Sequence, residues 1–303
     1  MTGEKLRLPK DWQRQISGKI QILRAKHLAK STGILHGFSA RTGGVSKLEG
    51  TLVLNLGPVE WDTTANVEKN RTLFLVALAG SPKTAANLKL VTLKQIHSDA
   101  IHHVEAPPAQ RLQGDALITA TPGLVLAVQT ADCIPILLAD PKRRVVAAVH
   151  AGWRGTLARV AAKTIGRMQM LFGTKPADVL AALGPGIGVC CYPVGLEVVQ
   201  KFNAQFARAR DWFDGPFDRL TTDDSPNPLQ WLNQMPPGHQ PPPPTANLDL
   251  IAANRWQLED AGLKPRNISA SNLCTACNVA SLFSYRAEHG NTGRLLGAIA
   301  LRP

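Results

Sequence analysis

The 303-residue sequence has no hydrophobic run long enough to cross a membrane. A spanning helix needs roughly 20 consecutive apolar residues. The longest apolar runs here are 124–128, 134–139 and 145–149. The opening residues, MTGEKLRLPKDWQRQ, are basic but are not followed by the apolar segment of a secretory signal. We therefore predict a cytoplasmic protein that makes no membrane contact.

Cysteines and aromatic residues are also scarce. The cysteines number five, and an odd count in a reducing compartment argues against a disulfide framework. Aromatic residues make up only 5% of the chain, so a platform for stacking nucleic-acid bases is poorly supplied despite the net charge of +12. The basic residues are scattered, and no nucleic-acid-binding motif is recognisable. We interpret the charge as a basic surface and predict no nucleic-acid partner.

Three common motifs of enzymes are missing as well. The sequence contains no G-x-x-x-x-G-K-[ST] phosphate loop, no strand followed by G-x-G-x-x-G, and no G-x-S-x-G nucleophile elbow. Nucleoside-triphosphate binding, dinucleotide binding and serine hydrolysis therefore have no motif to support them.

The segments that are present predict one α/β or α+β domain of mixed strands and helices. Helical spacing predicts helices over 65–80, 155–171, 193–207 and 248–263, and a short helix within 20–30. Residues 34–58 are typical of a strand, a loop and a strand. Further apolar runs predict strands at 89–97, 124–133, 134–140, 145–155, 179–186 and 294–303. Residues 208–247 contain a proline-rich polar stretch, which we interpret as a loop or disordered insertion.

Three residues are candidates for a metal site. His97, Cys133 and His150 each lie where an apolar strand meets a polar or glycine-rich turn. Imidazole and thiolate are ligands that suit Zn²⁺. The residues are 36 and 17 positions apart (133 − 97 and 150 − 133), unlike the tight pairs of zinc fingers. Such spacing fits a catalytic site in which one position stays open for water or substrate. A single histidine or cysteine beside a strand is more often simply packed, so spacing alone leaves both interpretations open.

The neighbours of these residues add candidates for catalysis and binding. Asp132 precedes the cysteine and could act as a base or orient a ligand. Trp153 offers a flat face or core packing, and Arg154 offers a fixed cation for an anion. Arg41 lies beside the glycine-rich turn of FSARTGG, whose amides could face an oxyanion.

A Cys-x-x-Cys pair, Cys274 and Cys277, occurs near the C-terminus. One such pair does not define a zinc site, and the adjacent Cys190 and Cys191 have the wrong spacing for a second pair. A redox pair, a structural thiol pair and an inert buried role all stay open for these cysteines.

Several segments, taken in order, resemble the signature blocks of a bacterial family. They are FSARTGGVS, LNLG, LKQIHSDA, GDALIT, PGLVLAVQTADCIPILLAD, VAAVHAGWRGTL, LGPGIGVCCYPVG, LDLIAANRWQL, and CTAC with FSYR and GRLLGAIAL. The chain is thereby similar to the purine nucleoside phosphorylase or laccase-domain family, also known as multicopper polyphenol oxidase-like and as peptidoglycan editing factor. The resemblance runs from about residue 34 to 303, and TADC with VHAGWRG at this spacing is highly specific.

For the fold, the resemblance implies one compact domain with α/β/β/α layers and mixed sheets, similar to the fold of bacterial cytotoxic necrotizing factor. It implies an N-terminal extension at 1–33 and a single domain at 34–303, with the proline-rich insertion at about 208–247. The oligomeric state is left open, with a monomer as the default expectation.

For the function, the resemblance implies that His97, Cys133 and His150 are the metal ligands, and their donor atoms favour zinc over copper as the cofactor. The implied activity is phosphorolysis of adenosine, inosine, guanosine and methylthioadenosine to base and ribose 1-phosphate. Deamination of adenosine at the same site is also implied.

The site residues that follow from these considerations fall into two groups. The expected catalytic residues are Cys133, His150 and Asp132. The expected contacts to substrate or phosphate are Arg41, Gln95 and Arg154.

Two other enzyme classes stay open. A polyphenol oxidase of the laccase type needs several copper centres, and the chain has only eight histidines to supply them. A cysteine hydrolase or amidase in peptidoglycan precursor editing would use Cys133 as a nucleophile activated by His150. Metal analysis tests the first alternative, and sensitivity to chelators tests the second.

Overall fold

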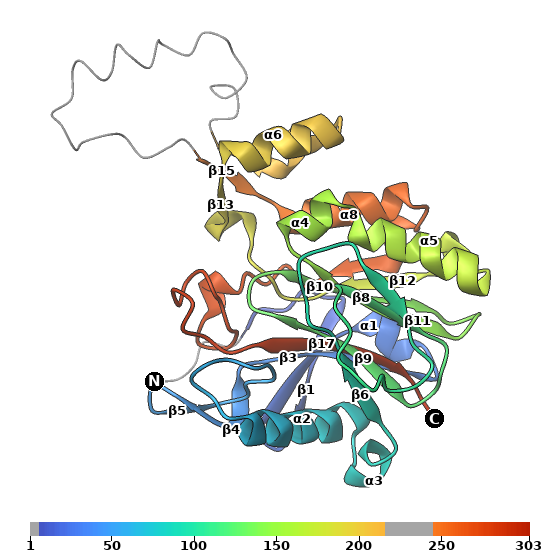
Figure 1. The fold of residues 1–303 in the computed structure, drawn as a ribbon, viewed down its shortest axis with the longest axis vertical. Coiled ribbons are helices and arrows are strands. Elements are labelled where there is room, and N and C mark those ends of the chain that lie inside the picture. The colour runs from blue at the N-terminus through green and yellow to red at the C-terminus, as the bar shows by residue number, and fades with distance from the viewer. Residues whose placement is uncertain (1–5, 216–244) are drawn as a thin grey trace, which may run out of the picture.

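The computed structural model describes residues 6–215 and 245–303, and its centre is a pair of stacked β-sheets (Figure 1). The first sheet contains, in order, β1 (Trp12–Ser17), β2 (Ile20–Ala25), β3 (Ile34–Ser39), β17 (Leu295–Leu301), β9 (Leu124–Thr130) and β6 (Lys89–Thr92). Its neighbouring strands are antiparallel except for β6 and β9. The C-terminal strand β17 lies inside this sheet, and all its residues are buried, as its continuous apolar sequence requires.

The second sheet is also mixed. It contains, in order, β16 (Ile268–Ala270), β12 (Leu180–Leu183), β10 (Ile134–Asp140), β11 (Val145–Ala151), β8 (Ala116–Thr119) and β7 (Ile101–His103). Its central pair β10 and β11 is antiparallel, whereas β12–β16 and β7–β8 are parallel. Every residue of β10 and β11 is buried, because both faces of these strands are covered.

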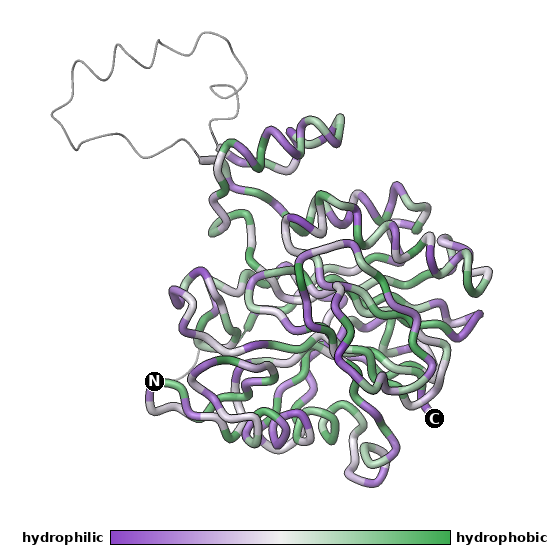
Figure 2. Tube along the Cα trace, viewed as in Figure 1, coloured by the Kyte–Doolittle hydropathy of each residue, from purple (hydrophilic) through white to green (hydrophobic). Residues whose placement is uncertain are grey.

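The two sheets share an apolar core, to which Phe38 and Leu126 contribute from the first sheet and Leu137 and Val146 from the second. Helix α2 (Thr64–Ala79) packs on the outer face of the first sheet. Helices α5 (Val160–Phe172) and α8 (Leu250–Asp260) pack on the outer face of the second. Hydrophobic residues accordingly concentrate along the strands (Figure 2). The order of layers is therefore α/β/β/α, as the resemblance implied.

Shorter elements surround these layers. Within the described ranges, the remaining helices are α1 (Lys26–Lys30), α3 (Pro82–Ala85), α4 (Trp153–Leu157) and α6 (Leu196–Gln205). The 3₁₀ turns are η1 (Pro176–Asp178), η2 (Val189–Cys191), η3 (Ala209–Trp212), η5 (Pro265–Asn267) and η6 (Ala276–Asn278). Two small sheets consist of β4 (Thr42–Leu48) with β5 (Thr51–Val53), and of β13 (Pro193–Gly195), β15 (Thr245–Leu248) and β14 (Phe213–Asp214).

The helix predicted over 65–80 is confirmed as α2. The Thr63 side chain accepts a hydrogen bond from the Asn66 N–H at its start, and Gly80 ends it in the left-handed conformation at φ 85°. The helix predicted over 248–263 is confirmed as α8. Its first predicted residue, Leu248, belongs instead to β15, and the helix is capped by Asp249.

Three helix predictions need correction. Within 20–30, residues 20–25 form β2, because they pair with β1 and β3, and only α1 is helical. The helix predicted over 155–171 is two helices, α4 and α5, because Arg159 between them has a left-handed φ of 61°. The helix predicted over 193–207 begins at Leu196, because residues 193–195 pair with β15 as strand β13.

The predicted domain division stays a prediction, but residues 12–25 of the N-terminal extension contribute β1 and β2 to the first sheet. At the borders of the predicted insertion, β14 pairs with β15. The proline-rich stretch at 227–244 lies outside the described residues. The likeness to cytotoxic necrotizing factor also stays a prediction. Among the helices within 6–215 and 245–303, none has the length and apolar character needed to cross a membrane.

Candidate metal centre and substrate pocket

Three side chains of the metal-ligand type meet where the ends of the two sheets come together. His97 lies in the loop after β6, Cys133 lies in the turn that crosses from β9 to β10, and His150 lies near the end of β11. Their ligand atoms all lie within 4.8 Å of one another, and Cys133 Sγ is 3.9 Å from His97 Nε2. Around a tetrahedral zinc ion such atoms are roughly 3.3–3.8 Å apart. The predicted convergence is confirmed, and we call this group the three-ligand site.

A buried carboxylate, Asp115, holds two of these ligands in place. Its Oδ1 accepts hydrogen bonds from His150 Nδ1 at 2.8 Å and from the His97 N–H at 3.0 Å. Its Oδ2 accepts from the Ser98 N–H at 2.6 Å and from the Ser98 hydroxyl at 2.8 Å. Because Nδ1 of His150 is engaged by the carboxylate, Nε2 is the ring nitrogen left to bind a metal, which it does after losing its proton.

The three ionisable groups of the site stabilise one another's charged forms. Burial alone would raise the pKa of Asp115, but hydrogen bonds from His150 and Ser98 lower it to about 2. Burial would also raise the pKa of the Cys133 thiol, but His150 and His97 lower it to about 6. Burial would lower the pKa of His150, whereas Cys133 and Asp115 raise it to about 9. The thiolate form of Cys133, which is the form that binds metals, is therefore stabilised here.

The backbone beside these ligands leaves room only for glycine. A Cβ atom at Gly152 would lie 2.8 Å from Cys133 Sγ and 3.1 Å from His97 Cδ2. Gly152 directly follows the strand that carries His150. The H-A-G sequence therefore supplies one ligand and, through the glycine, leaves room for the side chains of Cys133 and His97. Two imidazoles and one thiolate around this cradle fit a divalent transition-metal ion held by three protein ligands.

A pocket of about 580 Å³ includes the three-ligand site in its wall. Pockets for small organic ligands have volumes of roughly 300–1,000 Å³. The aromatic lining residues are Trp153, Tyr192 and Tyr285, and the cationic ones are Lys94, Arg111, Arg154, Arg286 and Arg294. In the described part of the chain, Asp132 is the only carboxylate in this lining. Flat aromatic faces beside guanidinium groups suit a planar molecule together with an anion.

Asp132 has most of its hydrogen-bonding capacity in use. Its Oδ1 accepts from the hydroxyls of Thr275 at 2.6 Å and Ser284 at 2.7 Å, and its Oδ2 accepts from the Arg286 N–H at 2.7 Å. Its backbone has a positive φ of 96°, which sets the turn that presents Cys133. These contacts favour a positioning role for the predicted catalytic Asp132 over proton transfer.

The three predicted contacts to substrate or phosphate have different positions. Arg154 lines the pocket, and its guanidinium lies 4.5 Å from the centre of the Trp153 ring. Gln95 also lines the pocket, but both ends of its amide bond the backbone of Gln129, at 2.7 and 2.8 Å.

Arg41 lies apart from the other two. It forms an ion pair with Glu288, donates to the Val279 carbonyl at 3.0 Å, and is absent from the pocket lining. Phosphate binding by Arg41 therefore stays a prediction that the pocket does not support.

Several residues at the site have no counterpart in the sequence-based prediction. Asp115 was missed because a single acid before an apolar strand carries no periodic pattern, although it stands in the GDALIT block. Tyr192, Arg286 and Arg294 were missed although they too stand within the resembling blocks. The prediction that Cys190 and Cys191 do not partner the C-terminal Cys-x-x-Cys is wrong. The Sγ atoms of all four cysteines lie within 4.8 Å of one another.

Known proteins are similar to this chain in sequence and fold over nearly its whole length. A family model described as multi-copper polyphenol oxidoreductase laccase matches residues 35–302. A protein of Deinococcus radiodurans named purine nucleoside phosphorylase is 36% identical over 283 residues, or 93% of this chain and 93% of that protein. One of the same name from Bacteroides thetaiotaomicron is 31% identical, over 93% of this chain and 96% of that protein. The crystal structure of YlmD from Geobacillus stearothermophilus is similar with a TM-score of 0.75 at 30% identity, covering 97% of this chain and 100% of that chain.

Proposed function

This chain belongs to the multi-copper polyphenol oxidoreductase laccase family, and we propose that it is a metal-dependent purine nucleoside phosphorylase. Its substrates are purine nucleosides, among them adenosine, inosine, guanosine and methylthioadenosine, and inorganic phosphate. One observation carries the proposal: ligand-type side chains, aromatic faces and guanidinium groups line one pocket. The names of the relatives from Deinococcus and Bacteroides support the same activity.

The ion that we propose for the three-ligand site is zinc, held by His97, Cys133 and His150. Mixed imidazole and thiolate donors are typical of zinc, and three protein ligands are typical of its catalytic sites. When bound, the ion supplies Lewis-acid chemistry that can activate water or polarise an oxygen atom. Asp115 keeps His150 in the orientation and tautomer that this role needs.

The residues of the pocket suit the bonds that phosphorolysis makes and breaks. A phosphate oxygen attacks C1′ of the sugar while the bond from C1′ to the base breaks. The base leaves with the electron pair and takes up a proton. Arg154, Arg286 and Arg294 supply positive charge for the phosphate, and Trp153 and Tyr192 supply flat faces for the purine.

Deamination of adenosine is the second activity that we propose for this pocket. Water adds at C6 of the adenine ring and ammonia leaves, which yields inosine. The same aromatic faces serve both reactions, because both substrates present a purine. Deamination needs no phosphate, so the two activities separate experimentally.

The test is to incubate the purified, metal-loaded protein with inosine or adenosine, with and without phosphate, and to separate the products by chromatography. Free hypoxanthine and ribose 1-phosphate that form only with phosphate support phosphorolysis. Inosine that forms from adenosine without phosphate supports deamination. A folded, metal-loaded protein that yields neither product would overturn the proposal.

Arginine variants sharpen this test. Arg154→Ala is expected to raise KM for phosphate by about 10- to 100-fold, because a hydrogen bond to a charged group contributes roughly 1.5–3 kcal/mol. Arg266→Ala removes an exposed cation outside the pocket and is the matched control. Arg41→Ala is expected to leave this KM near that of the wild type, because the Arg41 guanidinium is engaged by Glu288.

A cysteine hydrolase or amidase acting on peptidoglycan precursors is a second candidate, favoured by one observation. His150 lies between Cys133 and Asp115, as a base does between its nucleophile and the group that orients it. Removal of the metal distinguishes the candidates, because a cysteine nucleophile survives chelation and a zinc-dependent reaction does not. An active protein free of copper would likewise exclude the oxidase named in the family description.

A further inference from the structure

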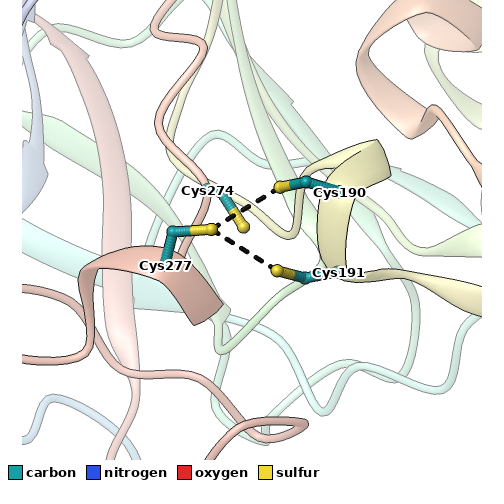
Figure 3. Close-up of side chains that lie close together, drawn as sticks. All are labelled: Cys190, Cys191, Cys274 and Cys277. Atoms are coloured by element: carbon teal, nitrogen blue, oxygen red, sulfur yellow. Dashed lines mark hydrogen bonds between the residues drawn. The ribbon is translucent and has the colours of Figure 1, made fainter.

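Cys190, Cys191, Cys274 and Cys277, the four-cysteine cluster, come from two segments that lie far apart in the sequence. Cys190 and Cys191 belong to η2, whereas Cys274 and Cys277 belong to the segment that contains η6. Their side chains point toward one another (Figure 3). The described pocket lining includes none of the four, so the cluster is separate from the three-ligand site.

The distances within the cluster match metal coordination better than a disulfide. Cys277 Sγ lies 3.5 Å from Cys190 Sγ and 3.4 Å from Cys191 Sγ, and all four Sγ atoms lie within 4.8 Å of one another. A disulfide bond is about 2.05 Å long. Four sulfur atoms around zinc, each about 2.3 Å from the ion, are about 3.8 Å apart. The two Sγ–Sγ distances from Cys277 are slightly shorter than this value, and the other separations do not exceed 4.8 Å.

The backbone around the cluster is arranged for closely spaced sulfurs. The Gly188 N–H donates to Cys274 Sγ at 3.2 Å, and such a bond stabilises a thiolate. A Cβ atom at Gly188 would lie 3.1 Å from Cys274 Cβ and 3.3 Å from Cys190 Sγ, so glycine leaves the space that the cysteines occupy. The Thr275 N–H donates to the Gly186 carbonyl at 2.9 Å and joins the two segments.

We propose that the four-cysteine cluster binds a structural zinc ion. Four thiolates complete a tetrahedral shell and leave no position for water or substrate, which is the composition of closed structural zinc sites. The thiol protons pass to solvent on binding, and no atom changes its oxidation state. Iron also accepts four thiolates, and the experiment below separates the two metals.

The proposed ion would stabilise the position of the pocket wall that contains Tyr192 and Asp132, without contacting the substrate. Tyr192, which lines the pocket, directly follows Cys191. Thr275 lies between the other two cysteines and donates to Asp132, the residue before Cys133. The inference stands on the cluster itself and does not depend on the proposed activity.

The test is the zinc content per chain of the full-length protein, purified with a reductant and without chelator. We expect two zinc ions in the wild type. One should remain in the double variant His97→Ala/His150→Ala, and Cys277→Ser should lose one. A double variant without stoichiometric zinc would overturn the proposal, and so would a Cys277→Ser variant that keeps two ions.

X-ray absorption at the zinc edge identifies the ligands directly. In the double variant we expect a shell of sulfur at about 2.3 Å, without nitrogen. If that variant does not fold, the same measurement on the wild type still tests the proposal. With both sites filled, the protein supplies five sulfur donors and two nitrogen donors in total. A shell richer in nitrogen than in sulfur would contradict the proposal, as would iron in the cluster or a disulfide between any of its cysteines.

Discussion

The three-ligand site and the four-cysteine cluster use similar ligands in different numbers and surroundings. The three-ligand site mixes nitrogen with sulfur and lies in the wall of a pocket of about 580 Å³. The cluster has four sulfurs, and its residues are absent from the described lining of that pocket. Three donors leave a coordination position for chemistry, whereas four complete the shell. A reactive metal site therefore differs from a structural one in the number of protein ligands and in the presence of a pocket beside them, more than in the types of residue that bind the metal.

The two sites are connected through one side chain. Asp132 precedes Cys133 in the sequence and accepts a hydrogen bond from Thr275, which lies between Cys274 and Cys277. Substitutions in the cluster should therefore also affect the three-ligand site, but less than they affect the cluster itself.

Loss of a ligand from the three-ligand site should have the largest effect on activity. We expect His97→Ala to lower kcat/KM for phosphorolysis on the order of 1,000-fold, because a catalytic metal contributes several kcal/mol. Initial rates and zinc content measure the effect, and the cluster should keep its ion. His103→Ala removes an imidazole from strand β7 and is the matched control. If His97→Ala loses less than about tenfold, the contrast between the two sites fails.

Loss of a ligand from the cluster should act first on stability. We expect Cys277→Ser to lower the melting temperature by about 5–10 °C, because a structural metal contributes directly to folding free energy. Thermal unfolding in the His97→Ala background isolates this ion from the other. A chelator should lower the melting temperature of that background and leave the combined variant unchanged. If His97→Ala and the combined variant His97→Ala/Cys277→Ser have equal melting temperatures without chelator, the cluster does not hold a structural metal.

Asp115→Asn tests the carboxylate behind the three-ligand site. The amide has nearly the same shape but lacks the charge, and its NH₂ group cannot accept the hydrogen bonds that Oδ1 and Oδ2 both accept. We expect zinc affinity at this site, or kcat/KM, to fall by about 10- to 100-fold, with the cluster unaffected. Asp178→Asn, which removes a carboxylate paired with exposed Lys142, is the control. Two variants with the same zinc affinity and rate would refute the role given to Asp115.

Thr275→Val tests the connection between the sites and should have the smallest effect. The variant removes a hydrogen bond to a charged carboxylate, so we expect a loss of about 1–3 kcal/mol in unfolding free energy and a severalfold fall in kcat/KM. Ser284→Ala removes a bond to the same Asp132 oxygen from outside the cluster and is the matched control. Only Thr275→Val should weaken zinc retention at the cluster. If both variants change zinc retention equally, Thr275 is not the connection.

Local patterns in the sequence were sufficient for several elements of the fold. Helix α2 was predictable because its cap, Thr63, and its stop, Gly80, are short-range features. Strands β10 and β11 were predictable because continuous apolar runs bounded by turn residues are typical of covered strands. Strand β2 was not predictable, since its pairing with β1 and β3 decided its conformation. The break between helices α4 and α5 was not predictable either, because the left-handed backbone of Arg159 follows no local residue pattern.

The sequence by itself determined the three metal-ligand candidates, the class of fold and the family, because these depend on residue types and on motifs along the chain. The tertiary structure decided which side chains face one another. It engaged Arg41 with Glu288, placed Asp115 behind His150, and joined cysteines 86 or 87 residues apart in the sequence. The reason is that such contacts depend on how two sheets stack and where their ends meet, and sequence separation does not encode that arrangement.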